Sequence, residues 1–210
     1  MDTAAQARAY AAADFTEPHD AFVERFQERF PEFRSGRVLD LGCGTADVTV
    51  RFARAYPDAR VHGVDGAPAM LDEGTQLVRS ADLGDRVSLE LVRLPSPTLN
   101  GAAYDAMVSN SLLHHLTDPG LLWETVASTA RASAPVFVMD LCRPASTEVA
   151  QHLVDMYAAG ESLVLRDDFY RSLCAAYTPD EVKAQLTAAA VDAFRVEPVG
   201  DRHLLVWGTR

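Results

Sequence analysis

Cysteine is scarce in this sequence, and long apolar runs are absent. The three cysteines, Cys43, Cys142 and Cys174, stand far apart, with no CxxC pair and no His/Cys ligand spacing. The sequence therefore indicates neither a disulfide framework nor a metal site. No apolar stretch approaches the roughly 20 residues that cross a bilayer, and the first residues lack the layout of a signal peptide. We expect reduced thiols, a cytoplasmic location and no membrane partner.

Basic residues are also scarce. The chain has 19 Lys and Arg residues against 30 Asp and Glu residues, which gives a net charge of −11. A field of that sign repels phosphate backbones, so we expect no nucleic-acid partner. Hydrophobic residues, in contrast, make up 48% of the 210 residues. This is enough for a full core, and the length suits one α/β domain over residues 1–210.

Short apolar runs alternate with helical patterns along most of the chain. The runs that favour strands are residues 37–41, 61–65, 87–92, 104–110 and 135–140. Helical patterns follow them at the spacing of parallel βαβ units. Near the end, residues 194–199 and 203–208 flank the turn-forming pair Gly200-Asp201 and predict a hairpin. The pattern predicts a Rossmann-like α/β fold. We expect a seven-stranded, mostly parallel sheet, with helices on both faces and an antiparallel last strand reversed at the sheet edge.

The alternation of strands and helices is missing from two segments. Residues 1–30 are rich in alanine and helical patterns, and residues 141–178 contain two helical stretches without a strand between them. Ligands of such sheets bind at the carboxyl ends of the strands. We therefore expect both segments to form a helical lid over that end of the sheet.

A glycine-rich turn links the first strand to its helix. Gly42 and Gly44 lie in this turn, with Asp40 before it and Asp47 after it. Glycine lets the backbone approach a ligand closely. A dinucleotide would lay its pyrophosphate on the helix N-terminus, and two acidic residues disfavour that arrangement. The turn therefore favours a ligand that carries positive charge.

An acidic residue also ends the second strand. Asp65 stands 21 positions after Gly44, and Gly66 follows it directly. A carboxylate in this position accepts hydrogen bonds from both hydroxyls of a ribose. The ligand expected from these two strand ends is therefore a cationic nucleoside.

These segments resemble a known family. VLDLGCGTAD, VHGVDGAPAML and YDAMVSNSLLHHLTDP are similar to segments of class I methyltransferases that depend on S-adenosylmethionine (SAM). The resemblance extends over nearly the whole chain and implies that SAM is the cofactor. The positions that it implies for SAM are Asp40 at the ammonium group, Gly42 and Gly44 at the methionine moiety, Asp65 at the ribose and Met70 over one face of the adenine. The further cofactor candidates are Gly66, Arg93, Leu94 and Asn110, and Asn110 is also a candidate for contact with the acceptor.

Two positions depart from the family pattern. Ala46 replaces the common third glycine of the turn. Arg93 stands near the place of an acid that usually contacts the adenine amino group. Adenine recognition is then expected to rest on the backbone of Leu94.

The chemistry has several candidate residues. His114 and His115 follow the fourth strand, and either is a candidate general base because an ordinary histidine pKa lies near neutrality. Tyr170 and Tyr177 are candidates because aromatic faces stabilise cations such as sulfonium. Asp140, which ends the fifth strand, is a candidate anchor for the acceptor, and a helix cap is its structural alternative.

The lid segments hold the remaining candidates. Tyr10, Asp14 and Phe15 are expected at the substrate, and Tyr157 and Phe169 add aromatic side chains. The same aromatic side chains would also suit a small apolar core under the lid.

Three functions are compatible with these residues. The first is a methyltransferase that acts on a small, neutral or cationic acceptor and releases S-adenosylhomocysteine. The second is a cyclase, in which the amino group of SAM attacks its own γ-carbon to give azetidine-2-carboxylate and methylthioadenosine. The third is a SAM-binding subunit without catalysis. An NAD-dependent oxidoreductase is a more remote fourth.

Overall fold

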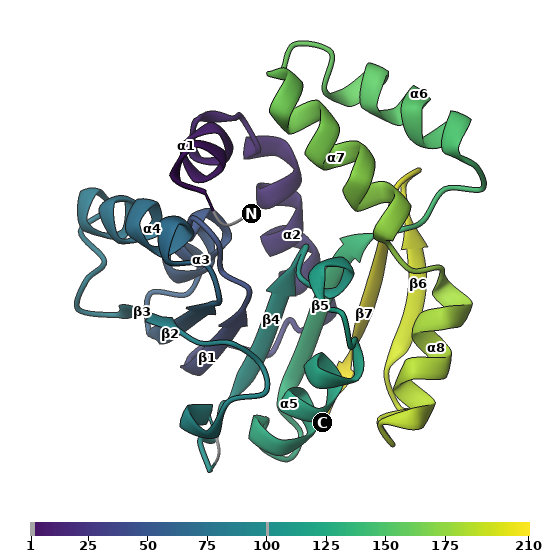
Figure 1. Ribbon diagram of the computed structural model, residues 1–210. Coiled ribbons are helices and arrows are strands. Elements are labelled where there is room, and N and C mark those ends of the chain that lie inside the picture. Colours follow the sequence, from purple (N-terminus) through teal and green to yellow (C-terminus); the bar gives the residue numbers. More distant parts are fainter. Residues whose placement is uncertain (1–2, 100) are drawn as a thin grey trace.

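A seven-stranded sheet forms the centre of the computed structural model, which describes residues 3–99 and 101–210 (Figure 1). The strand order is β3-β2-β1-β4-β5-β7-β6. Strands β1 to β5 pair in parallel, and β7 is antiparallel to both of its neighbours. The strand bounds are β1 (Gly36–Leu41), β2 (Ala59–Asp65), β3 (Val87–Leu91), β4 (Ala106–Asn110), β5 (Pro135–Leu141), β6 (Arg195–Val199) and β7 (His203–Thr209).

The predicted fold is confirmed, but the reversed strand does not lie at the sheet edge. Strand β7 is placed between β5 and β6, so β6 is the edge strand. The composition of the two strands explains this order. Leu204, Leu205 and Val206 of β7 are completely buried, whereas β6 carries Glu197 and Pro198, which suit an edge.

The core lies on both faces of the sheet. Successive side chains of a strand point to opposite faces. In β5, Phe137 and Met139 join the core on one face, while Val136 and Val138 join the core on the other. This pattern explains why the central strands read as nearly continuous apolar runs.

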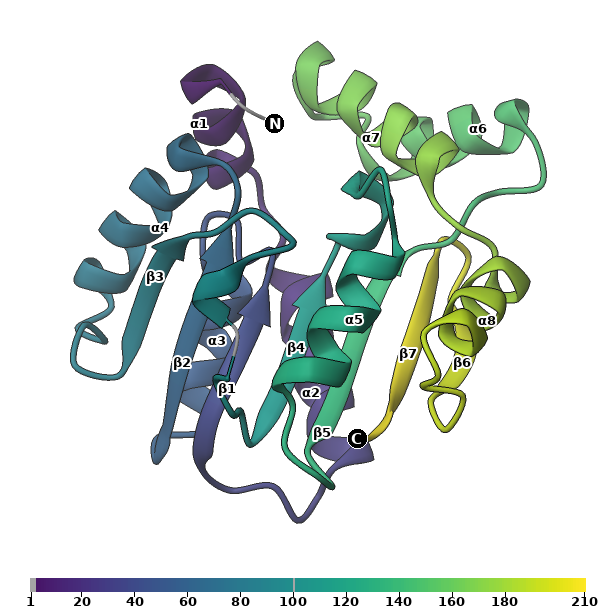
Figure 2. The same ribbon diagram turned by 60° about the horizontal axis from the view of Figure 1, so that its bottom comes forward.

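Helices cover both faces and one end of the sheet (Figure 2). Helices α2, α3 and α4 supply the core of one face, and α5 and α8 supply that of the other. Helices α1, α6 and α7 lie at the carboxyl ends of the parallel strands (Figures 1 and 2). The helix bounds are α1 (Ala4–Ala12), α2 (Thr16–Arg29), α3 (Asp47–Ala55), α4 (Pro68–Ser80), α5 (Gly120–Thr129), α6 (Thr147–Tyr157), α7 (Leu163–Ala175) and α8 (Pro179–Ala188), with two short 3₁₀ helices, η1 (Pro97–Leu99) and η2 (Leu113–His115).

The N-terminal lid expected over residues 1–30 is shorter in the structure. Phe22 and Phe26 of α2 are completely buried, and the ring of Phe26 packs edge-on against Phe52 and Phe137. Most of α2 therefore belongs to the main core, because its phenylalanines recur at helical spacing on one face. Of the N-terminal segment, α1 and the start of α2 remain beside the strand ends.

The helices of the second lid segment begin at side-chain caps. Ser146 accepts a hydrogen bond from the backbone of Val149, and Ser162 accepts one from Leu165. Such caps satisfy backbone donors that the first helical turn leaves unpaired. Among the described residues, no helix is long and apolar enough to cross a membrane.

Candidate functional site

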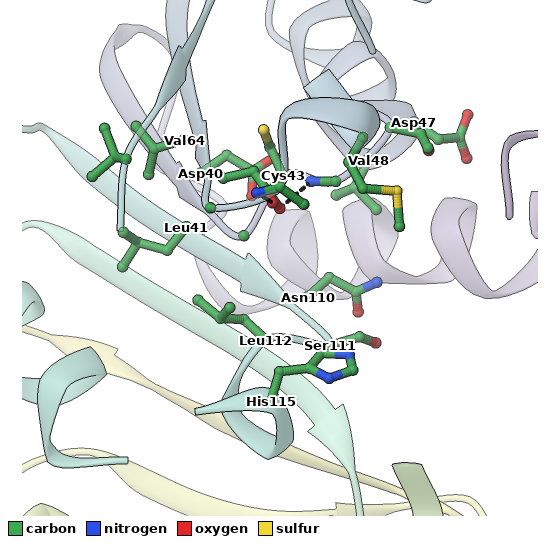
Figure 3. A pocket seen from close by; sticks show the side chains of 18 of the residues that line it. Asp40, Leu41, Cys43, Asp47, Val48, Val64, Asn110, Ser111, Leu112 and His115 are labelled. Atoms are coloured by element: carbon green, nitrogen blue, oxygen red, sulfur yellow. Dashed lines mark hydrogen bonds between the residues drawn. The ribbon is translucent and has the colours of Figure 1, made fainter. Parts of the chain in front are cut away.

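The carboxyl ends of β1, β2 and β4 border a cavity of about 490 Å³, which we call the first cavity (Figure 3). In Figure 3, Asn110, Ser111 and His115 lie across the cavity from the turn that carries Asp40 and Cys43. The side chains and backbone that line it include all nine positions that the sequence implies for a cofactor: Asp40, Gly42, Gly44, Asp65, Gly66, Met70, Arg93, Leu94 and Asn110.

The turn after β1 brings its backbone to the cavity. Gly42 has a φ of +74°, and a Cβ added there would lie 2.8 Å from the side chain of Leu112. Gly44 has a φ of +53°, and an added Cβ would meet no described atom within 4 Å, so this residue borders open space. Ala46 adopts a φ of +62°, a conformation that costs an L-residue roughly 1–2 kcal/mol. The turn thus keeps the glycine geometry at all three positions.

Asp65 holds two loops together at the same cavity. Its Oδ2 accepts a hydrogen bond from Gly44 N at 2.9 Å, and its Oδ1 accepts one from Ala67 N at 2.8 Å. An ionised carboxylate has about four acceptor sites. Asp65 therefore retains lone pairs for a ligand while it fixes the turn.

Asp40 is buried beneath the turn. Its Oδ2 accepts a hydrogen bond from the hydroxyl of Thr49 at 2.6 Å. Burial raises the pKa of Asp40 to about 7, although the hydrogen bond from Thr49 lowers it, and the nearby Asp65 adds to the rise. The carboxyl group would therefore gain from a cationic partner, which matches the ammonium group of SAM.

A second cavity of about 380 Å³ adjoins the first and lies under the lid helices. The substrate candidates Tyr10, Asp14 and Phe15 line this second cavity, as do the lid aromatics Tyr157 and Phe169. Arg202 and His203 of the terminal hairpin also contribute. The hairpin was not predicted at the site, because only the fold brings it under the lid.

Five residues line both cavities, and we call this set the junction: Tyr10, His19, Asn110, Ser111 and His115. Ser111 has a φ of +59°, a rarely populated conformation that is typical of functional sites. Within the described part of the chain, the buried Oδ1 of Asn110 has no hydrogen-bond partner. A buried polar atom without a partner favours a ligand beside it.

The two adjacent histidines have different environments. His114 is buried, and its Nδ1 lies 2.6 Å from Oδ1 of Asp140. His115 exposes its ring to the cavities, with protein around its other sides. Desolvation of the ring is the larger cause and the neighbouring His114 the next, and together they lower the pKa of His115 to about 4. At neutral pH His115 is therefore uncharged and a weak base.

Asp140 makes the contact of a helix cap, the structural alternative to its predicted role as acceptor anchor. Its Oδ2 accepts from Leu113 N at 2.7 Å, and its Oδ1 accepts from Leu141 N and faces His114. Within the described ranges, the linings of the two cavities do not include Asp140. Its carboxylate instead orients η2 and His114.

The candidates Tyr170 and Tyr177 also lie outside the described linings of both cavities. Tyr170 packs against the small core of α6 and α7. Tyr177 packs against the core beside α8 and pairs with Cys142 in an isolated bridge. Phe169, the neighbour of Tyr170 in α7, takes the position that faces the second cavity.

His19 is a site residue that the sequence did not single out. Its Nδ1 lies 2.6 Å from Oδ2 of Asp47, the first residue of α3. Arg51 binds the same carboxylate oxygen through Nε at 2.9 Å. Burial alone would raise the pKa of Asp47, but the hydrogen bonds from His19 and Arg51 lower it below the usual value. Only the position of His19 within the predicted lid segment pointed to it.

A hydrogen bond connects the two parts of the lid. Nε2 of Gln6 in α1 donates to Oδ2 of Asp168 in α7 at 3.2 Å. Helix α1 also places Ala7 against Ala67 and Met70 at the wall of the first cavity. Helix α1 therefore borders both cavities, whereas α6 and α7 border the second.

Fold and site together define a Rossmann-like α/β protein with a cavity at the carboxyl ends of its parallel strands. A family model described as "Methyltransferase domain" matches residues 38–136. Residues 38–136 therefore belong to a methyltransferase family, and the fold of the whole chain is that of SAM-dependent methyltransferases.

Curated relatives and a solved structure agree with this placement. The 27-O-demethylrifamycin SV methyltransferase of Amycolatopsis mediterranei is 28% identical over 127 residues, which cover 59% of this chain and 44% of that protein. The trans-aconitate 2-methyltransferase of Deinococcus radiodurans is 30% identical over 151 residues, covering 70% and 53%. The chain thus spans about half the length of these relatives. A SAM-dependent methyltransferase from Aquifex aeolicus has the same fold, with a TM-score of 0.72 at 16% identity, covering 100% of this chain and 99% of that one.

Proposed function

We propose that this protein transfers a methyl group from SAM, bound in the first cavity, to a small molecule bound in the second cavity. The observation that carries the proposal is the junction, where Tyr10, Asn110 and His115 border both cavities. A reaction between two bound molecules requires such a passage. The rate enhancement comes from holding the two reactants in line at close range.

The first cavity suits the parts of SAM. Asp40 would hold the ammonium group, the backbone of Gly42 and Gly44 would border the methionine moiety, and Asp65 would accept from the ribose hydroxyls. Met70 and the segment at Arg93 and Leu94 would enclose the adenine, with Nε of Arg93 donating to the carbonyl of Gly66 at 3.2 Å. When bound, SAM supplies a methyl group activated by its positive sulfur. The protein supplies the orientation.

The charge of the second cavity favours a neutral or cationic acceptor. Four carboxylates line it, those of Asp14, Glu17, Glu161 and Asp168. Its cationic side chain, Arg202, binds Asp201 at 2.8 Å and stacks 3.4 Å from the ring centroid of Tyr157.

His203, the histidine of the hairpin, does not change the net negative charge of the second cavity. Burial, together with Arg202, lowers the pKa of His203 to about 4, so His203 is uncharged at neutral pH. Trans-aconitate, the acceptor in the name of the Deinococcus relative, carries several carboxylates. An acceptor of that charge would be repelled by the second cavity.

One observation favours the cyclase as a second candidate. The rings of Tyr10 and Phe15 lie 4.7 Å apart beside the junction. Aromatic faces stabilise cations by roughly 0.5–2 kcal/mol, and a SAM cyclase would need such stabilisation of the sulfonium group. If the protein is a cyclase, Tyr10 and Phe15 replace the earlier candidates Tyr170 and Tyr177.

The experiment that tests the proposal incubates the protein with SAM alone and then with a set of small amines and alcohols. A methyltransferase consumes SAM only when an acceptor is present, and its nucleoside product is S-adenosylhomocysteine. We expect this outcome, measured by chromatography of the nucleosides. Acceptor-free methylthioadenosine well above a protein-free blank would replace the proposal with the cyclase, because an internal amine needs no second binding event.

A further inference from the structure

His19 lies at the junction with one ring nitrogen already bound. Its Nδ1 is 2.6 Å from Oδ2 of Asp47, and the ring borders both cavities. The ionised carboxylate of Asp47 can only accept hydrogen bonds, so Nδ1 must carry the proton. In the neutral imidazole the lone pair is then on Nε2, the nitrogen that remains to face the junction.

The surroundings hold this imidazole in place. Asp47 is itself held by Arg51, whose guanidinium also binds Asp20. The ring of Phe15 packs 5.4 Å from the imidazole centroid. A histidine fixed by a carboxylate and turned toward a reaction site has the arrangement of a general base.

The other three histidines of the site are less suited to this role. His203 lines the second cavity but not the described wall of the first, and its pKa is lowered to about 4. His115 is a weak base, as its lowered pKa indicates. His114 lines the second cavity but not the described wall of the first. His19 is the histidine that combines a carboxylate partner with a position between the two cavities.

We infer that His19, oriented by Asp47, is the base that accepts a proton from an amine acceptor at the junction. This inference rests on the proposed function and narrows the acceptor to a small amine. The amine nitrogen loses an N–H proton to Nε2 of His19 and uses the freed electron pair to bond the methyl carbon. The electron pair of the broken carbon–sulfur bond stays on sulfur. The carboxylates of the second cavity attract the amine in its cationic form.

Several titratable groups bind His19 or its partner Asp47, or line the two cavities with it. Asp47 binds His19 and is joined to Arg51, which also binds Asp20. Other titratable groups line one or both cavities with His19: Tyr10, Asp14, Glu17, His115 and Asp168. Burial, with Asp47 next, raises the pKa of Tyr10 to about 12, so Tyr10 remains an uncharged hydroxyl throughout the range of a histidine titration.

The test uses two nucleosides that need no acceptor. Sinefungin carries an amine where SAM carries its methyl group, and S-adenosylhomocysteine carries nothing there. Calorimetry measures both affinities in the wild type, in His19→Asn, and in the control His62→Asn. The asparagine keeps a donor for Asp47 but removes the Nε2 lone pair. His62 is matched to His19 because it is also hydrogen-bonded, to Tyr104 and Glu90, outside the two cavities.

We expect the wild type to bind sinefungin about 10-fold to 100-fold more tightly than S-adenosylhomocysteine, as for a hydrogen bond to a charged group. This excess should fall to about threefold or less in His19→Asn, while S-adenosylhomocysteine affinity stays within about twofold and His62→Asn behaves like the wild type.

Three results would overturn the inference. An equal loss of both affinities in His19→Asn would mean that His19 holds a part that the two nucleosides share. An unchanged excess would mean that His19 does not face the transferred group. If neither nucleoside binds to the wild type, both the proposed function and the inference are wrong. The first two results, in contrast, leave the proposed function intact.

Discussion

The two cavities are built from different kinds of residues. The first is bordered mainly by strand ends and the turns that follow them, so contiguous stretches such as residues 40–48 and 64–67 supply most of its wall. The second is lined by side chains from α1, α2, η2, β5, α6, α7 and the terminal hairpin. Backbone geometry needs glycine at fixed positions, which leaves a motif in the sequence. A cavity of side chains from distant segments leaves none.

The largest expected effect belongs to the first cavity. Asp65→Ala removes an acceptor for the ribose and for the backbone of Gly44 and Ala67. We expect the affinity for S-adenosylhomocysteine to fall by about 1.5–3 kcal/mol, or about 10-fold to 150-fold. Calorimetry measures this loss, and Asp72→Ala on the exposed side of α4 is the matched control. An unchanged affinity in Asp65→Ala, or tighter binding of NAD than of SAM by the wild type, would contradict the cofactor site.

This difference between the cavities explains how much the sequence predicted. The parallel order of β1 to β5 and all nine expected cofactor positions follow from apolar runs, the glycine turn and the family motifs, and the structure brings those positions to one cavity. Their binding roles remain predictions. The position of β7 could not be read from local pattern, because a hairpin predicts that two strands pair and not which of them meets β5.

Predictions for the second cavity fared less well. Tyr10, Asp14 and Phe15 do line it, but Tyr170, Tyr177 and Asp140 do not, within the described residues. Aromatic composition alone cannot tell which side of a lid helix faces inward. His19 was missed because its partner Asp47 is 28 positions away and only the packing of α2 on α3 joins them.

A smaller effect, in the same cavity, comes from the pH dependence of Asp40. Its pKa of about 7 in the folded chain exceeds the ordinary value of 3.8. The folded state therefore binds a proton that the unfolded state releases. The stability of the ligand-free protein should fall as pH rises from about 4 to about 7, at no more than about 1.4 kcal/mol per pH unit from this group.

Ligand binding should show the opposite trend. A bound ammonium group favours ionised Asp40, so binding releases a proton and the affinity for S-adenosylhomocysteine should rise with pH up to about 7. The limit for one proton is about tenfold per pH unit. Calorimetry at several pH values checks this in the wild type and in Asp40→Asn, which keeps an acceptor for Thr49. If the asparagine variant retains the same pH dependence, another group is responsible.

The smallest expected effect concerns the hydrogen bond that joins the lid across the second cavity. Gln6→Ala removes the 3.2 Å bond from α1 to Asp168 of α7. A neutral donor at a partly buried carboxylate contributes about 0.5–1 kcal/mol, so S-adenosylhomocysteine affinity should fall only about two- to fivefold. The effect reaches the first cavity because α1 packs Ala7 against Met70 at its wall. Hydrogen exchange should show that the ligand protects α1 and α7 in the wild type and protects both less in Gln6→Ala.

Gln76→Ala is the control, because Gln76 binds only a backbone carbonyl of its own helix among the described contacts. If the ligand protects the turn at Gly44 and the loop at Asp65 but neither lid helix, the two cavities do not share a closing lid, and α1 and α7 are fixed parts of the core.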